Sequence, residues 1–161
     1  MAVQKTNVMR ILEQKKIPYT PHQYPHGDDH VDGETVAQLI GHAPEQVFKT
    51  LVTVGASKQN YVFVIPVGCE LDLKKAAKAT GEKSVMMLSV GNLLSLTGYV
   101  RGGCSPIGMK KAFPTYIHAS CMMLDTMIVS AGKIGQQVEL QPAALLQLTR
   151  GKAVDVVKDE L

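Results

Sequence analysis

The chain has 161 residues, of which 45% are hydrophobic and 19% are charged, and its formal net charge at pH 7 is +3. This length is typical of one compact domain with a buried core, so we expect a single domain over residues 1–161. A charge this small argues against a protein that binds DNA through dense blocks of lysine and arginine, although it permits an anionic partner. No apolar run approaches the roughly 20 residues that a membrane helix needs, so we expect no membrane partner.

The cysteines are odd in number, lack Cys-x-x-Cys spacing, and occur without an apolar N-terminal signal segment. This usage predicts reduced thiols and a cytoplasmic protein.

Helical and strand patterns alternate along the chain, which predicts an α/β or α+β domain. The first helix carries Val8, Ile11 and Leu12 on one face. It ends before Pro18, because proline disfavours helix in the residue before it, and a short extended segment follows at residues 19–24.

A second helix is predicted after a polar loop, because Val36, Leu39 and Ile40 repeat with helical spacing. Asp32 is suited to cap the start of this helix, and Gly41 is suited to end it.

Two strands at residues 47–54 and 61–66 are rich in β-branched and aromatic residues and are separated by a turn-forming segment. They predict a hairpin at the centre of the sheet. The next helix begins at an Asp72 cap and ends at Gly81.

Another helix is predicted at residues 90–96, behind a Ser89 cap, and it leads into a glycine-rich segment. Pro142 is well placed as the first residue of a last helix, which runs to Gly151. Between these helices the composition predicts three further strands, at residues 115–119, 127–130 and 137–140.

The glycine-rich segment, residues 97–108, contains four glycines, and such density indicates either a backbone that approaches a small polar ligand or an ordinary turn. Cys104 and Ser105 are candidate nucleophiles, yet the G-x-S-x-x-G run differs from the hydrolase elbow and no feature nominates His118 as a base. Nor does the segment match a phosphate loop or a dinucleotide fingerprint. We expect a site built from backbone groups, one lysine and hydroxyls.

Lys49 shares a face of its predicted strand with Val47 and Leu51. A lysine on that face lies either at a cleft, where its ammonium binds a phosphate or an oxyanion, or at an edge. If the core lies on the other face, Lys49 is simply solvated, and strand alternation by itself favours this alternative.

His22, His26 and His30 recur at every fourth residue, which suggests a metal site. Pro21 and Pro25 forbid the continuous helix that would stack the three rings, so a polar surface loop is the better interpretation.

Four motifs, in order along nearly the whole chain, resemble the YbaK/EbsC family of bacterial Cys-tRNA(Pro) deacylases. This family is related to the editing domain inserted in bacterial prolyl-tRNA synthetases. The motifs are F-K-T-L at residues 48–51, L-D-L-K-K-A-A-K at 71–78, G-Y followed by G-G-C-S-P-I-G within 98–108, and V-S-A-G-K at 129–133.

The resemblance implies a single mixed α/β domain whose curved, partly barrel-like mixed sheet is flanked by helices. It implies hydrolysis of the ester between a wrongly attached cysteine and tRNA(Pro), without cofactor or metal. Such editing is needed because cysteine and proline are too similar in size for a pocket to separate them well. Prolyl-tRNA synthetase is the partner that the resemblance implies for tRNA selectivity.

The family's mechanism implies that the substrate's own thiol attacks its carbonyl and leaves a thiolactone, so the reaction is lyase-like and Cys104 is a packing residue. Lys49 contacts the terminal nucleotide, and Gly102 and Tyr24 complete the catalytic set. The substrate-binding wall that the resemblance implies consists of Gly103, Ser105, Pro106, Ser130, Gly132, Lys133 and Gln137.

One departure concerns Gln137, because family members often carry an aspartate there, and an amide supplies no charge. Two alternatives stay open: a deacylase for alanyl-, seryl- or threonyl-tRNA, and a non-catalytic module that binds the tRNA acceptor end or a synthetase. A metal-dependent hydrolase is a more distant one. The RNA backbone is expected to meet a basic surface, or these side chains are merely solvated: Lys74, Lys75, Lys78, Arg101, Lys110, Lys111 and Lys133.

Overall fold

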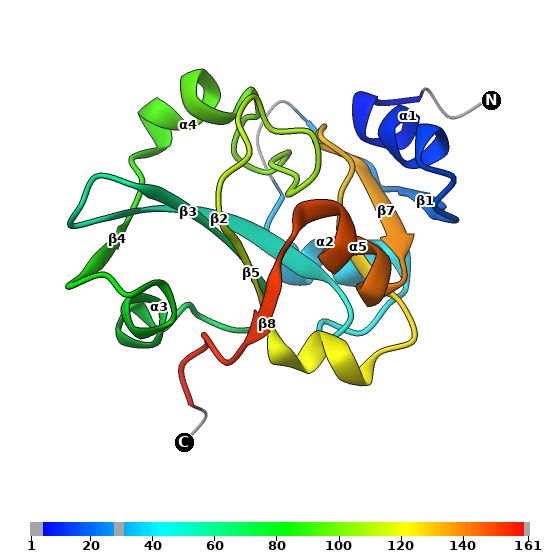
Figure 1. The fold of residues 1–161 in the computed structure, drawn as a ribbon. Coiled ribbons are helices and arrows are strands. Elements are labelled where there is room, and N and C mark those ends of the chain that lie inside the picture. Colours follow the sequence, from blue (N-terminus) through cyan, green and yellow to red (C-terminus); the bar gives the residue numbers. More distant parts are fainter. Residues whose placement is uncertain (1–4, 28–30, 160–161) are drawn as a thin grey trace.

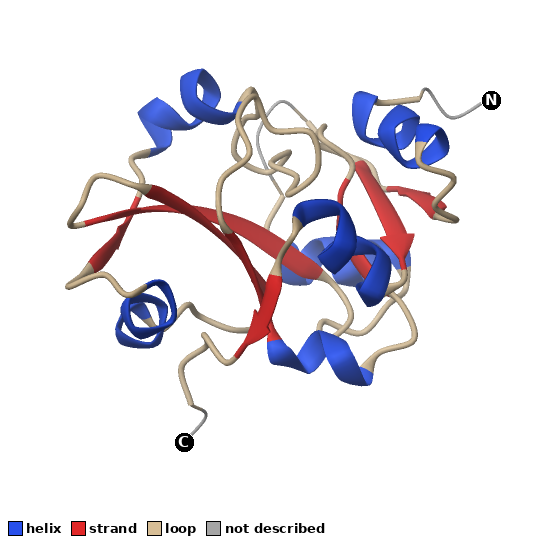
Figure 2. Cartoon of the chain, viewed as in Figure 1, coloured by secondary structure: helices blue, strands red, loops and turns tan. Residues whose placement is uncertain are grey.

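A computed structural model describes residues 5–27 and 31–159 of the chain. The strands gather into two sheets and the helices lie around them (Figures 1 and 2). This arrangement confirms the expected mixed α/β fold with flanking helices. The strands form two open sheets and do not close into a barrel.

The smaller sheet is antiparallel and has the order β1-β7-β6. In its register His22 lies opposite Gln137, which in turn lies opposite Ser130. Its strands are β1 (Thr20–Gln23), β6 (Met127–Ser130) and β7 (Gln136–Leu140).

The larger sheet has the order β4-β2-β3-β5-β8, in which β3, β5 and β8 run parallel and the other pairs are antiparallel. The predicted hairpin is confirmed as β2 and β3, and β3 is the central strand. A single parallel bridge between Val47 and Ile128 links this sheet to the smaller one. The strands are β2 (Phe48–Gly55), β3 (Asn60–Pro66), β4 (Val85–Met87), β5 (Thr115–His118) and β8 (Lys152–Val154).

The helices begin and end close to the predicted positions. Asp32 accepts a hydrogen bond from the Thr35 backbone nitrogen, and Asp72 accepts from two backbone nitrogens, so both predicted caps are confirmed. Ser89 is the N-cap residue of its helix, but its side chain makes no capping hydrogen bond. The helices are α1 (Asn7–Gln14), α2 (Gly33–Ile40), α3 (Leu73–Thr80), α4 (Val90–Thr97), α5 (Pro142–Thr149) and a 3-10 helix, η1 (Ala119–Met123).

Sequence patterns did not predict β4 or β8, and they extended β5 by one residue into η1. Both missed strands are three residues long and lie at the two edges of the larger sheet. Such strands are largely exposed and too short to show a period-2 pattern.

Three apolar clusters cover the sheets on both faces. The largest joins α1 and α5 to β2 and β6 and includes Leu12, Phe48 and Val129. The second lies between α3 and the larger sheet, around Phe63. The third packs α2 against Ile128 of the smaller sheet. Among residues 5–27 and 31–159, no helix is long and apolar enough to cross a membrane.

Candidate functional site

A cleft of about 330 Å³ lies where α2, β2 and the glycine-rich segment meet the smaller sheet. This volume is within the range of small-molecule sites. Several residues that the sequence nominated from distant parts of the chain line it: Tyr24, Lys49, Gly102, Ser130 and Gln137. The rest of its lining includes Asp32, Gly33, Val36, Thr50, Arg101 and Cys104.

The register of the smaller sheet explains why three of these residues meet. Ser130 and Gln137 are direct partners across β6 and β7. Tyr24 follows β1, two residues after the register partner of Gln137, and its backbone nitrogen donates to the Gly135 carbonyl at 3.0 Å. Side chains two residues apart share a face of a strand, so all three side chains reach the same face.

Lys49 is half-buried at the cleft, and its Nζ donates to the Val67 carbonyl oxygen at 3.5 Å. The solvated alternative assumed that one face of β2 is the core. Instead, Phe48 packs into the largest cluster on one face while Val47 packs against α2 on the other. Lys49 therefore stands on an apolar face at the point where that face opens into the cleft.

Two buried oxygens of cleft residues, Thr50 Oγ1 and Gln137 Oε1, have no hydrogen-bond partner in the part of the chain that the structure describes. Buried polar atoms in folded proteins are nearly always paired. The lining of the cleft, which also includes Lys49, therefore offers unused hydrogen-bonding groups, and this suits a polar ligand.

The wall opposite β2 comes from the segment after α4. Gly102 has φ of +87°, a conformation that glycine adopts without strain, and this bend brings it to the cleft. Next to it, Gly103 is packed against the turn before β7. A Cβ atom on Gly103 would lie 3.1 Å from the Ile134 nitrogen and 3.2 Å from the Lys133 carbonyl carbon.

Five nominated residues stand outside the cleft lining: Gly103, Ser105, Pro106, Gly132 and Lys133. Ser105 is fully buried, and its Oγ accepts from the Ile107 nitrogen at 3.2 Å. Pro106 lines a separate cavity of about 240 Å³ beside α1 and α5. The backbone N–H of Gly132 donates a hydrogen bond to Ser130 Oγ at 3.1 Å, whereas the Lys133 side chain is exposed.

Of the seven basic residues proposed to face RNA, Arg101 lines the cleft. Lys75 is instead engaged in ion pairs with Asp155 at 3.0 Å and Asp159 at 2.8 Å. Lys111 lies beside the separate cavity, 5.9 Å from the centre of the Phe113 ring. Sequence reasoning treated Asp32 only as a helix cap, although it also lines the cleft. Hydrogen bonds from Thr35 hold the pKa of Asp32 below its ordinary value.

The polar surface loop expected for His22, His26 and His30 does not describe His22, which lies half-buried in β1. His22 Nε2 lies 2.7 Å from Glu139 Oε1, whereas the exposed His26 bonds through Nδ1 to the Gly27 carbonyl. His30 lies outside the described residues. His22 lies in the extended strand β1, where residues four positions apart are separated by about 13 Å and do not come together as they do on a helix.

Replacing Cys104 with alanine is expected to leave catalysis within about threefold of the parent protein. Burial raises the pKa of this thiol to about 12, so it stays protonated near neutral pH and is a poor nucleophile. Steady-state rates of the deacylation that the sequence resemblance implies, measured for the variant and for the parent after iodoacetamide treatment at pH 7, test this. Loss of activity on alkylation in the parent but not in the variant would show that the thiol is accessible.

A model of the aminoacyl-tRNA editing domain matches residues 29–148. The chain is 50% identical over 157 residues, 98% of its length and 96% of the relative, to EbsC of Enterococcus faecalis, a proposed Cys-tRNA(Pro)/Cys-tRNA(Cys) deacylase. It is 29% identical over 127 residues, 78% of the chain and 80% of the relative, to the uncharacterised protein YwhH of Bacillus subtilis.

One similar solved structure is a proposed trans-editing enzyme for prolyl-tRNA synthetase. Its TM-score is 0.82 at 23% identity, and the match covers 98% of this chain and 100% of that one. A hypothetical protein superposes with a TM-score of 0.85 at 18% identity over 95% of this chain and 100% of the other. At these identities the likeness shows a shared fold.

Proposed function

Because the chain belongs to the aminoacyl-tRNA editing domain family, on the YbaK/EbsC side of it, we propose that it is a trans-acting hydrolase that deacylates Cys-tRNA(Pro). The observation that carries this proposal is the position of Lys49. It lies half-buried in a cleft walled by the glycine-rich segment, and it belongs to the F-K-T-L motif.

The cleft residues suit the acceptor end of a charged tRNA. Lys49 and Arg101 supply positive charge for the terminal phosphate or for an oxyanion on the ester, and Arg is able to hold phosphate with two hydrogen bonds. The backbone of Gly102, with Tyr24 and Ser130, faces the aminoacyl group. Gln137 stands where family members often carry a carboxylate, and it contributes an amide that contacts the substrate without charge.

No enzyme nucleophile takes part in the proposed reaction. The cysteine thiol of the substrate loses its proton, its sulfur bonds to the ester carbonyl carbon, and the bond from that carbon to the ribose oxygen breaks. The ribose oxygen takes up a proton and a thiolactone leaves, and water then opens the thiolactone to free cysteine. The protein accelerates the reaction by holding the sulfur close to the carbonyl carbon. In the best intramolecular cases such positioning lowers the activation barrier by about 7–11 kcal/mol.

The absence of charge at Gln137 favours one competing function, a module that binds the acceptor end or a synthetase without cleaving the ester. In that case the cleft still holds the terminal nucleotide, because Lys49 and Arg101 remain. Binding without release of cysteine at high enzyme concentration would support this alternative.

A panel of charged tRNAs is expected to show selective release of cysteine. The measurement compares Cys-, Ala-, Ser- and Thr-tRNA as substrates at equal concentration. Serine differs from cysteine by one atom but lacks the thiol nucleophile, so we expect its release to be at least about 100-fold slower. Equal rates for cysteine and serine would show that a water molecule attacks and that the chain is a broader deacylase.

A comparison of Cys-tRNA(Pro) with Cys-tRNA(Cys), made with and without prolyl-tRNA synthetase, tests the proposed partner. Two cationic side chains line the cleft and the net charge is only +3. So few positive charges bind the end of a tRNA but do not extend to its distant parts. We therefore expect little preference for tRNA(Pro) over tRNA(Cys) from the protein alone, and a clear preference once the synthetase is present.

A further inference from the structure

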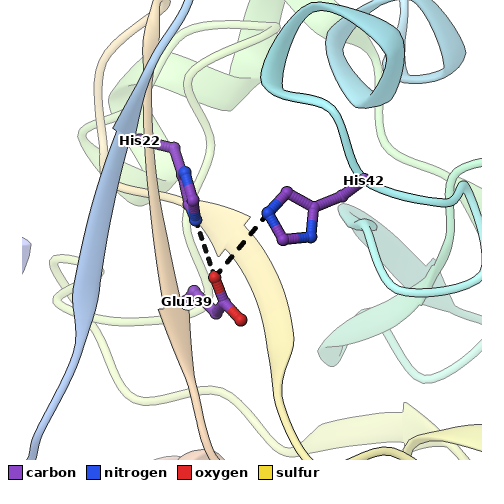
Figure 3. Close-up of side chains that lie close together, drawn as sticks. All are labelled: His22, His42 and Glu139. Carbon is purple, nitrogen blue, oxygen red and sulfur yellow. Dashed lines mark hydrogen bonds and ion pairs between the residues drawn. The ribbon is translucent and has the colours of Figure 1, made fainter.

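Two imidazoles and a carboxylate converge beside the cleft, on the face of the smaller sheet that α2 covers. His22 comes from β1, Glu139 from β7 and His42 from the residue after the C-cap of α2. Figure 3 shows both rings directed at the carboxylate. The three potential donor atoms lie within 4.8 Å of one another. Their side chains are 19%, 17% and 25% exposed, for His22, Glu139 and His42, so water reaches the cluster.

The hydrogen bonds around His42 determine which of its nitrogens faces Glu139. The amide nitrogen of Gln46 donates to the Thr126 carbonyl at 3.3 Å and to Thr126 Oγ1 at 2.9 Å. A carbonyl only accepts, so the Gln46 amide is oriented with Oε1 toward His42, 2.9 Å from Nδ1. His42 Nδ1 therefore carries a proton, and Nε2 is the nitrogen that points at the carboxylate.

This arrangement brings two electron-rich atoms of the cluster face to face with no proton between them. His42 Nε2 lies 3.9 Å from Glu139 Oε1, too far for a hydrogen bond, and in a neutral ring its lone pair faces a carboxylate oxygen. The other carboxylate oxygen is already occupied, because Thr126 Oγ1 donates to Oε2 at 2.5 Å. A cation between Nε2 and Oε1 removes the repulsion between these two electron-rich atoms.

We propose that His22, His42 and Glu139 bind a divalent transition-metal ion of the Zn²⁺ type, with water completing its coordination. Two imidazole nitrogens and one carboxylate oxygen form a donor set that such ions prefer. Bonds of about 2.0–2.2 Å in a tetrahedral site place donors about 3.3 Å apart. The pairs at 2.7 Å and 3.9 Å differ from that spacing by about 0.6 Å each, and the two imidazole nitrogens, which lie within 4.8 Å of each other, must approach as well.

The hydrogen bonds around the cluster are those that usually orient metal-binding side chains. A ligating imidazole normally donates its second nitrogen to an oxygen, which orients the ring and selects the tautomer. Gln46 does this for His42, and Thr126 holds the carboxylate. Binding requires the proton to leave Nε2 of His22, so metal uptake is expected to release protons.

The ion would join α2 to the smaller sheet and so stabilise one wall of the cleft. Gln137 precedes Glu139 by two residues on the same face of β7, and Gly33 and Val36 of α2 line the cleft. This inference concerns a structural site and does not depend on the proposed deacylase function.

Isothermal titration of the untagged, metal-stripped protein with ZnCl₂ tests the proposal. We expect one equivalent to bind and the melting temperature to rise with added Zn²⁺. Glu139→Gln and His42→Gln are each expected to weaken binding at least tenfold. His26→Ala removes an exposed histidine that lies outside the cluster, and it is expected to bind and to be stabilised like the parent.

X-ray absorption of the Zn²⁺-loaded protein should show nitrogen and oxygen scatterers and no sulfur. Circular dichroism of the metal-free variants verifies that they are folded. A Gln46→Leu variant, which keeps all three ligands, is expected to bind about tenfold or more weakly. Absence of binding in the parent, sulfur ligation, or unchanged affinity in folded Glu139→Gln and His42→Gln would each overturn the proposal.

Discussion

Replacing Lys49 with alanine is expected to lower kcat/KM for Cys-tRNA(Pro) by about 100- to 1000-fold. The ammonium is the only charged group of the F-K-T-L motif, and it stands at an otherwise apolar face of β2. In a half-buried site, a charge that meets a phosphate or a developing oxyanion is worth far more than in water, and removing one such donor costs about this factor.

Two control variants separate this effect from damage to the fold. Lys49→Met keeps the apolar stem and removes the charge, so it is expected to lose as much activity as Lys49→Ala while melting like the parent. Lys83→Ala removes an exposed lysine that neither lines the cleft nor belongs to the basic surface expected to meet RNA, and it is expected to be fully active. Turnover by Lys49→Met at more than about a tenth of the parent rate would contradict the proposed role.

Introducing a side chain at Gly103 is expected to give the second largest loss. A Cβ atom there would lie within 3.1–3.3 Å of three backbone atoms of Lys133 and Ile134, and backbone cannot rotate away as a side chain does. The glycine-rich segment and the turn before β7 must therefore separate, which moves Gly102 in the cleft wall. Because a misplacement of about 1 Å costs up to about 100-fold, Gly103→Val is expected to lower kcat/KM by 10- to 100-fold.

Gly91→Ala is the matched control for Gly103. The nearest atom to a Cβ on Gly91 is Ser89 Oγ at 3.8 Å, an ordinary contact, so this variant is expected to retain parental activity and stability. Gly103→Ala tests the same clash with the smallest side chain and is expected to lie between the two. If Gly103→Val is folded and fully active, the wall does not need its present position for catalysis.

Local sequence signals predicted most of the elements. Asp32 with Gly41, and Asp72 with Gly81, correctly marked the ends of α2 and α3, because a capping carboxylate and a left-handed glycine act within a few residues. The β2–β3 hairpin and the start of α5 at Pro142 were also predicted correctly. The edge strands β4 and β8 were missed, since three exposed residues carry no pattern and pair only through neighbours distant in sequence.

The face of Lys49 could not be predicted from strand alternation alone. Alternation assumes one buried face and one solvated face, whereas clusters on both sides of the sheet cover β2. The family motif placed Lys49 in a site, and the structure places it at a cleft. The expectation of a polar surface loop was wrong for His22 for a related reason, because β1 pairs with β7 and brings His22 to Glu139, 117 residues away.

The sequence by itself determined the family, the mixed α/β class, most helix and strand positions, and the glycine-rich segment, because these depend on local propensities and contiguous motifs. The tertiary structure decided which of the nominated residues share the cleft. It also brought His22, His42 and Glu139 together. Both outcomes depend on sheet register and on the packing of α2 across the smaller sheet, and contacts between residues far apart in the chain leave no periodic signal in it.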